Sequence, residues 1–258
     1  MLYQQISVRM GRIYEILMNS PDEKNRLTNC SMDEIVEALN EAANDRKCYA
    51  IIFGAVGDTF CLGGGQLKDF RKNTPKEIME FGDHFIKVHT AFKRNPKPVI
   101  CAVEGEALGG GFSLVEACDL AVCADSAQLS ISELQGGLAP AMGLTGLFEE
   151  MPKKVVMELG LMSRKLSARE ALEYGIVNRV VPRDQVMQET RNIAECFSDK
   201  SPTGIALFKE VYRRMGMYEY ERRMEIAQSL LVSLFKSNDG QEVITAKQEG
   251  RFPIWSDS

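Results

Sequence analysis

The chain has 258 residues, of which 45% are hydrophobic and 26% are charged, as in an ordinary globular protein. This composition excludes a disordered or fibrous chain, and the length is enough to bury a substantial core. A formal net charge of -5 argues against a nucleic-acid partner, because gripping phosphate backbones needs lysine and arginine clustered on one face.

The cysteines and the N-terminus bear on location. The seven cysteines are odd in number, lack C-x-x-C spacing and in several cases lie in apolar runs, so we expect reduced core residues in a cytoplasmic protein. Residues 1–19 carry Arg9 and Arg12 among their apolar positions, which is unlike a signal peptide. No apolar run is long enough to span a bilayer, so no membrane partner is expected.

The first half of the chain alternates strand and helix signals. A hairpin is expected around Met10-Gly11, and the capping box Ser31-x-x-Glu34 predicts a helix that runs to about residue 44. Short apolar runs bounded by turn residues are typical of buried parallel strands, so the order specifies an α/β core. The expected elements are strands at 3–9, 12–18, 49–53, 98–103 and 120–123, and helices from Thr74-x-x-Glu77 to 94 and over 112–118.

From Pro152 onward the periodicity is almost all helical, with one strand expected at 176–181. The capping box Ser167-x-x-Glu170 opens one of these helices, over 167–174. Apolar stripes on several faces of the late helices predict packing against another subunit as well as against their own core. The other helices are expected at 153–161, 185–198, 203–215, 218–235 and 240–248.

Two glycine-rich segments, at 63–65 and 109–111, each follow an apolar strand and precede a helix. This placement aims free N–H groups and a positive helix end at one spot, and glycine allows a ligand to approach closely. The glycines could serve only as turns and close-packing positions, and a nucleotide loop is disfavoured because neither segment contains Gly-Lys-Ser/Thr or a full G-x-G-x-x-G. Paired N–H donors without an obvious nucleophile motif favour an oxyanion hole.

Four blocks between Phe60 and Pro182 resemble the crotonase superfamily, also called the enoyl-CoA hydratase/isomerase family. They are Phe60-Cys-Leu-Gly-Gly, the run 98–119 around Leu-Gly-Gly-Gly-Phe, the run Ala127-Gln-Leu-Ser-Ile-Ser-Glu133, and residues 166–182. The resemblance implies an α/β spiral of ββα units over residues 1–197 and a C-terminal helical oligomerisation region over 198–258. It also implies a homotrimer or hexamer, and a substrate that is an acyl-CoA or other pantetheine thioester.

Carried over by position, the resemblance implies that the N–H groups of Gly64 and Gly110 hold the thioester oxygen and that Glu133 moves protons. The first loop reads Gly-Gly-Gly-Gln where the family usually has GAD and an apolar residue, so Gly65 stays an alternative to Gly64. Family members need no metal and no cofactor beyond the CoA of the substrate for this chemistry. The residues expected to contact the substrate are Leu62, Ser113, Lys24 and Lys68, the two lysines near the CoA phosphate or adenine.

Ser113 stands where the family's hydratases have a second glutamate. Addition of water to a 2-enoyl-CoA is best served by two carboxylates, whereas one carboxylate can take a proton from C2 and return it at C4. The expected function is therefore an enolate-forming enoyl-CoA isomerase or hydratase with a single catalytic glutamate. The alternatives are a superfamily decarboxylase of a malonyl- or glutaconyl-type thioester and a non-catalytic acyl-CoA-binding member.

Other polar residues have weaker claims. As a hydrolase nucleophile Ser113 would need a histidine base, and none is visible in the sequence. His84 and His89 lie five residues apart on the helix after Pro75, which does not place both on one face, so no metal site is expected. Glu106 and Glu116 flank the second glycine loop as further acid candidates, and an exposed structural role is the alternative for Glu106.

Overall fold

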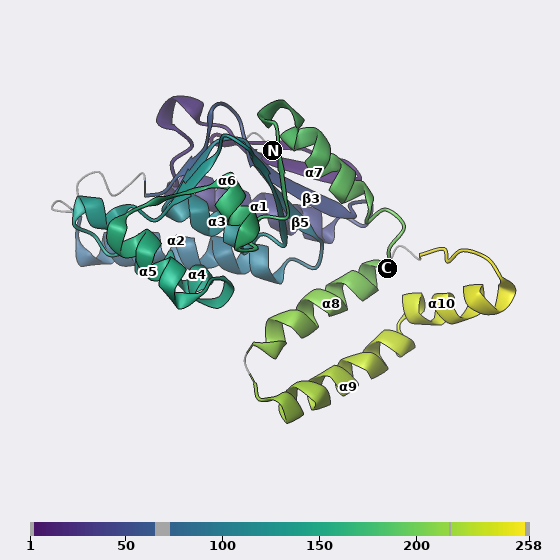
Figure 1. Ribbon diagram of the computed structural model, residues 1–258. Helices are drawn as coiled ribbons and strands as arrows, with labels where there is room; N and C mark the ends of the chain where they lie inside the picture. Colours follow the sequence, from purple (N-terminus) through teal and green to yellow (C-terminus); the bar gives the residue numbers. More distant parts are fainter. Residues whose placement is uncertain (1–2, 65–72, 217, 256–258) are drawn as a thin grey trace.

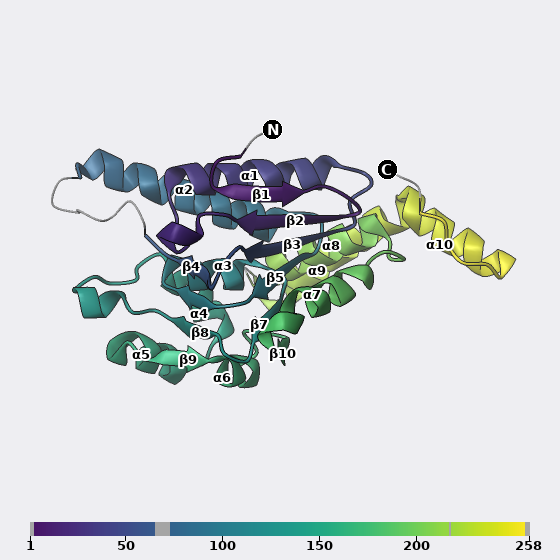
Figure 2. The same ribbon diagram turned by 90° about the horizontal axis from the view of Figure 1, so that it is seen from above.

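The computed structural model describes residues 3–64, 73–216 and 218–255 (Figure 1). Within these residues a six-stranded sheet, in the order β1-β2-β3-β5-β7-β10, lies next to a four-stranded sheet, in the order β4-β6-β8-β9 (Figure 2). Helices cover the sheets, and the last three helices extend away from them (Figure 1). The predicted α/β class is confirmed.

The six-stranded sheet holds most of the apolar core. Its first two strands form the predicted antiparallel hairpin, and every other neighbouring pair is parallel. Every residue of β5 is buried, as expected for a central parallel strand that is covered on both faces. The strands are β1 (Ile6–Arg9), β2 (Ile13–Met18), β3 (Ala50–Ala55), β5 (Val99–Val103), β7 (Leu120–Ala124) and β10 (Arg179–Val181).

The four-stranded sheet was missed by the sequence analysis. Its strands have only three or four residues, too few for an apolar periodicity to show. They are β4 (Thr59–Leu62), β6 (Glu106–Leu108), β8 (Gln128–Ser130) and β9 (Lys165–Ser167). Because β4, β6 and β8 run parallel, the segments that follow them leave from one edge of this sheet.

The helix signals were right in place and partly wrong in detail. The capping boxes at Thr74 and Ser167 are present as predicted. The helix α1 (Asn29–Asn44), however, is capped by Thr28, with Ser31 as the third helical residue. Glu34 does not close a box, because its carboxylate accepts from the N–H groups of Gln4 and Gln5 and so ties the N-terminal segment to α1.

The other helices follow the predicted order, and one was not predicted. Helix α4 (Leu144–Glu150) is the addition, and the strand expected at 176–181 is confined to β10. The remaining helices are α2 (Pro75–Arg94), α3 (Gly110–Ala117), α5 (Lys153–Met162), α6 (Ala168–Glu173), α7 (Val186–Glu195), α8 (Pro202–Met215), α9 (Tyr220–Lys236) and α10 (Asn238–Glu249). Among the described helices, none is both long and apolar enough to cross a lipid bilayer.

Three buried phenylalanines connect the two sheets to α2. The ring of Phe53 on β3 meets Phe60 on β4 edge to face at 5.8 Å between centroids, and Phe92 on α2 at 4.9 Å. All three side chains are at most 1% exposed. Buried aromatic pairs in this geometry stabilise a core beyond the area they bury, so the small sheet is held firmly against the large one.

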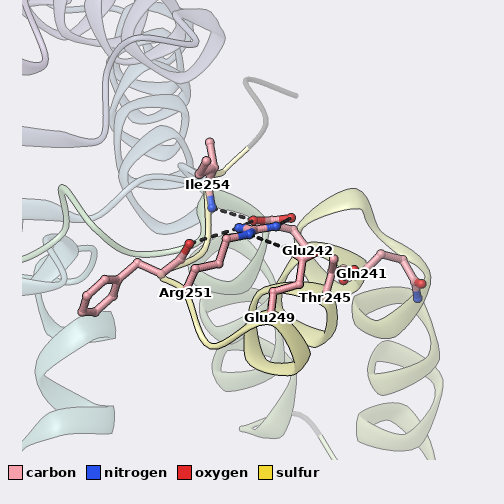
Figure 3. A network of polar contacts seen from close by, with 7 residues as sticks. Gln241, Glu242, Thr245, Glu249, Arg251 and Ile254 are labelled. Carbon is pink, nitrogen blue, oxygen red and sulfur yellow. Dashed lines mark hydrogen bonds and ion pairs between the residues drawn. The ribbon is translucent and has the colours of Figure 1, made fainter.

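The C-terminal helices carry apolar side chains that the described chain leaves uncovered. Phe208 and Tyr212, one turn apart on α8, are 72% and 76% exposed, and α9 adds Met224, Leu231, Val232 and Phe235. The segment after α10 is held by Arg251, whose guanidinium pairs with Glu242 and Glu249, while Glu242 also accepts from the Ile254 N–H (Figure 3). The division at residue 198 falls between α7 and α8 and stays a prediction.

Asn25 fixes the turn that lies along the first glycine loop. Its side chain is fully buried, donates to the carbonyl oxygens of Val56 (2.9 Å) and Thr59 (2.8 Å), and accepts from the Ser20 N–H (2.9 Å). Its φ of 49° is in the left-handed region that asparagine tolerates better than most residues. Because its neighbour Lys24 accepts from the Leu62 N–H (3.2 Å), this turn supports the end of β4.

We expect Asn25→Ala to lower the free energy of unfolding by about 2–4 kcal/mol, because buried backbone groups lose their partners. Urea denaturation measures the change. Asn40→Ala, on an exposed position of α1, is the control and should stay within about 0.5 kcal/mol of the wild type. An Asn25→Ala loss no larger than that of the control would contradict the assignment.

Candidate active site

The two glycine loops leave the same edge of the small sheet and touch each other. Leu62 and Leu108, the last residues of β4 and β6, are partners in the sheet. The N–H of Gly63 donates to the carbonyl oxygen of Leu108 (2.9 Å), and the N–H of Gly109 donates to that of Ser130 (2.8 Å). In each loop the first glycine therefore extends the sheet by one hydrogen bond.

The second glycine of each loop has an N–H group with no hydrogen-bond acceptor among the described residues. These are Gly64 and Gly110, the two residues expected to hold the thioester oxygen. Gly110 is the first residue of α3, where an N–H has no partner inside its own helix. Gly64 has a φ of +67°, a conformation open to glycine. The alternative donor, Gly65, and the lysine Lys68 lie outside the described residues.

Absence of side chains lets the loops meet backbone to backbone. A Cβ on Gly63 would lie 2.3 Å from the nitrogen of Gly110, and one on Gly111 would lie 2.1 Å from the carbonyl oxygen of Cys61. Both distances are impossible without moving backbone, so these two glycines serve close packing. The packing brings the N-terminus of α3 to the end of β4, which places both unpaired donors in one region.

Glu133 follows β8 and turns its carboxyl group towards the second glycine loop. Its Oε1 lies 2.7 Å from where a Cβ on Gly109 would be, and Gly109 has a φ of +53°. The Oε2 atom is buried and has no hydrogen-bond partner among the described residues. Burial raises the pKa of Glu133 above its usual value. A carboxyl oxygen that is buried without a hydrogen-bond partner is costly, and such groups gather at functional sites.

Ser113 has a histidine partner that the sequence analysis missed. Its Oγ lies 3.0 Å from Nε2 of His89 and 2.7 Å from the carbonyl oxygen of Gly110. The imidazole also stacks on Phe85, with ring centroids 4.1 Å apart. The statement that no histidine base is visible for Ser113 was therefore wrong. The packing of α2 against α3 makes this pair, and no local spacing in the sequence encodes it.

The other candidates divide between the loop region and ordinary structural contacts. Leu62 ends β4, and Lys24 is exposed beside the first loop, held there by its own carbonyl oxygen. Glu106 pairs with Lys165 of β9 (2.7 Å), which gives it a structural role. Glu116 is buried in α3 and packs against Gly146 of α4.

Residues 9–258 match the family model described as enoyl-CoA hydratase/isomerase. The chain belongs to the enoyl-CoA hydratase/isomerase family. The match covers every strand after β1, both glycine loops and the C-terminal helices, so the resemblance to the crotonase superfamily holds for nearly the whole chain.

Individual family members give the same result. The carnitinyl-CoA dehydratase of Escherichia coli K12 is 34% identical over an alignment of 254 residues that covers 96% of this chain and 96% of that one. The crystal structure of an enoyl-CoA hydratase from Bacillus anthracis superposes with a TM-score of 0.90 at 26% identity, over 99% of this chain and 100% of that one. An enoyl-CoA hydratase from Mycobacterium smegmatis shares the fold with a TM-score of 0.91 at 24% identity, over 98% and 99% of the two chains.

The buried carboxyl group predicts that Glu133→Gln stabilises the folded protein. Because burial raises the folded-state pKa of Glu133, the stability linked to its proton is present below the unfolded-state pKa and is lost as pH rises through the folded-state pKa. At pH 7 the mutant should therefore have the higher free energy of unfolding, and its advantage should shrink as the pH falls through the pKa of Glu133. Urea denaturation between pH 4 and 8 measures this.

Glu80→Gln, on an exposed position of α2, is the matched control and should show no such gain. A Glu133→Gln protein that is no more stable than the wild type at pH 7 would show that the carboxyl group is well solvated.

Proposed function

We propose that this member of the family converts an acyl-CoA thioester through an enolate, as an enoyl-CoA isomerase or hydratase in which Glu133 moves the proton at C2. The observation that carries the proposal is the convergence of three groups: the N–H groups of Gly64 and Gly110, which have no acceptor among the described residues, and the partly buried carboxyl of Glu133 beside Gly109. Each comes from a segment that follows a strand of the small sheet.

The proposed step is proton removal next to the thioester. The thioester oxygen accepts from both N–H groups, and the N-terminal end of α3 adds its positive dipole. Glu133 takes a proton from C2, the C–H electron pair forms the C1–C2 double bond, and the carbonyl oxygen becomes the oxyanion. Removing one such donor costs ~10²–10³ in rate, so the two N–H groups supply the largest share of the stabilisation. This chemistry needs no metal and no redox cofactor.

Two outcomes of the enolate are open to this site. The serine at position 113, where the family's hydratases have a glutamate, favours a double-bond shift by Glu133 alone. The names of the relatives, a carnitinyl-CoA dehydratase and enoyl-CoA hydratases, favour loss or addition of water. A panel of 2-enoyl, 3-enoyl, 3-hydroxyacyl and malonyl-type CoA esters, with the products identified, separates the two. Lys24, beside the first loop, is the proposed contact for the CoA moiety.

We expect Glu133→Gln to abolish turnover while the dissociation constant of a CoA ester stays within about threefold of the wild type. The amide keeps the shape of the side chain but cannot accept the C2 proton, and general-base catalysis is worth ~10²–10⁴ in rate. Exchange of the C2 protons of a saturated acyl-CoA in deuterated water, followed by NMR, reports this step without the later chemistry.

Glu106→Gln, which removes a surface ion pair, should leave the exchange rate unchanged. Normal exchange in Glu133→Gln, or no exchange in the wild type, would dispose of the proposed role.

The uncovered apolar face of α8 and α9 supports the proposal of a homotrimer or hexamer. Light scattering after gel filtration should give three or six times the 28.8 kDa mass of one chain. Phe208→Glu should shift the protein towards the monomer, because a carboxylate would be buried without a partner. Arg169→Glu, at an exposed position on α6, should not. A wild-type protein that is monomeric at micromolar concentration would contradict the proposal.

A further inference from the structure

His89 and Ser113 belong to an unbroken chain of polar contacts at the start of α3. Nδ1 of His89 lies 2.8 Å from the carbonyl oxygen of Phe85, and its Nε2 lies 3.0 Å from Oγ of Ser113. That Oγ lies 2.7 Å from the carbonyl oxygen of Gly110. This series of three contacts therefore begins and ends at a backbone carbonyl oxygen.

With a neutral imidazole, the three contacts have only two protons between them, so one contact has no hydrogen bond. A carbonyl oxygen only accepts, so the contact with Phe85 needs a proton on Nδ1 and the contact with Gly110 needs the hydroxyl proton. The remaining contact, between imidazole and hydroxyl, then needs a proton on Nε2. Only the imidazolium form makes all three contacts hydrogen bonds, so the site already has an acceptor for the additional proton on Nε2.

Burial nevertheless favours the neutral imidazole. Burial lowers the pKa of His89 below its usual value, against the opposing effect of its hydrogen bonds to Phe85 and Ser113. A group that burial shifts towards the unprotonated form, and whose hydrogen-bond partners for the protonated form are in place, has the properties of a general base.

The pair lies at the second glycine loop, on a different element from Glu133. Ser113 shares the first turn of α3 with Gly110, whose N–H is the proposed oxyanion donor. His89 and Phe85 come from α2, and a Cβ on Gly110 would lie 3.2 Å from the Phe85 ring. Glu133 instead reaches the loop after β8, at Gly109. Two proton-transfer groups thus approach one glycine loop from separate segments.

We propose that His89 and Ser113 act together as the second acid–base group of the site, so that the enzyme adds water to a 2-enoyl thioester, and removes it, without a second carboxylate. This inference rests on the proposed function and decides between its two outcomes. Ser113 contacts the reacting water, and His89 is a positioning and proton-holding residue that acts through Ser113.

Water is the only co-reactant in the step. Its proton passes to Oγ of Ser113 while the hydroxyl proton passes to Nε2 of His89. The water oxygen forms a bond to C3, the C2–C3 π electrons move to C1–C2, and the thioester oxygen takes the negative charge. Protonated Glu133 then gives its proton to C2, which completes the 3-hydroxyacyl thioester. In the reverse direction Glu133 takes the C2 proton, and the imidazolium returns its proton through Ser113 to the leaving hydroxyl group.

The test compares His89→Gln, Ser113→Ala and the double variant with the wild-type protein. Each single variant should lower kcat about 10²–10³-fold on the 2-enoyl- or 3-hydroxyacyl-CoA that the wild type converts, with little change in KM. Because the two residues act as one unit, the double variant should be no slower than the slower single variant. Hydration should fall at least tenfold more than exchange of C2 protons in all three, since exchange needs only Glu133 and the two N–H groups.

His84→Gln is the matched control, because the other histidine lies on the same helix and pairs with Asp33 instead. The C2 exchange also shows that each variant is folded around an intact site, and Ser113→Ala is a small change within a helix.

The inference would be overturned if the single variants hydrated the substrate at rates within threefold of the wild type, or if the two losses in kcat multiplied in the double variant. It would also be overturned by a wild-type protein that exchanges C2 protons but converts no 2-enoyl or 3-hydroxyacyl ester. Loss of C2 exchange in the wild type would instead refute the proposed function itself.

Discussion

The site depends on one close contact between two stretches of backbone. Gly63 and Gly110 approach so closely that a single added carbon atom on Gly63 would overlap the Gly110 nitrogen. This contact joins the end of β4 to the start of α3, and Gly111 brings α3 equally close to Cys61. The hydrogen bonds of Gly63 and Gly109 use the first donor of each loop, and the next N–H of each has no acceptor in the part of the chain that the structure describes. The same packing that builds the fold thus presents the pair of donors.

Desolvation gives the side chains around these donors their chemistry. Glu133 has a buried oxygen with no partner among residues 3–64, 73–216 and 218–255, and burial raises the pKa of its carboxyl group above that of an exposed glutamate. His89 is driven the other way, since burial of its imidazole favours the uncharged form. Burial therefore shifts the two groups in opposite directions, Glu133 towards its protonated form and His89 towards its neutral form. Burying these polar groups lowers the free energy of unfolding, as is common at catalytic sites.

Local signals in the sequence were enough to predict the large sheet and most helices, but not to predict the small sheet. The boxes at Thr74 and Ser167 begin their helices as predicted, because a capping box is complete within four residues. At the start of α1 two possible capping boxes overlap, one from Thr28 to Ser31 and one from Ser31 to Glu34. The first is formed, and the Glu34 carboxylate binds the N-terminal segment instead. The strands β4, β6 and β8 are too short to show a period, although Gly64, Gly110 and Glu133 each lie on the segment that follows one of them.

Predictions for the site itself divide in the same way. Gly64, Gly110 and Glu133 were predicted from the family resemblance, and the structure brings their segments together at one edge of the small sheet. The partner of Ser113 could not be found, because His89 is 24 residues away on a helix whose packing against α3 no local pattern encodes. Glu106 looked equally eligible by its place before the loop, yet it pairs with Lys165.

The most direct measurement is a crystal structure of the protein with a bound acyl-CoA. The account predicts that the thioester oxygen lies about 3 Å from the nitrogens of both Gly64 and Gly110, with the Glu133 carboxyl group in contact with C2. A thioester oxygen that faces solvent, or one held by neither N–H group while Glu133 points away from C2, would contradict it.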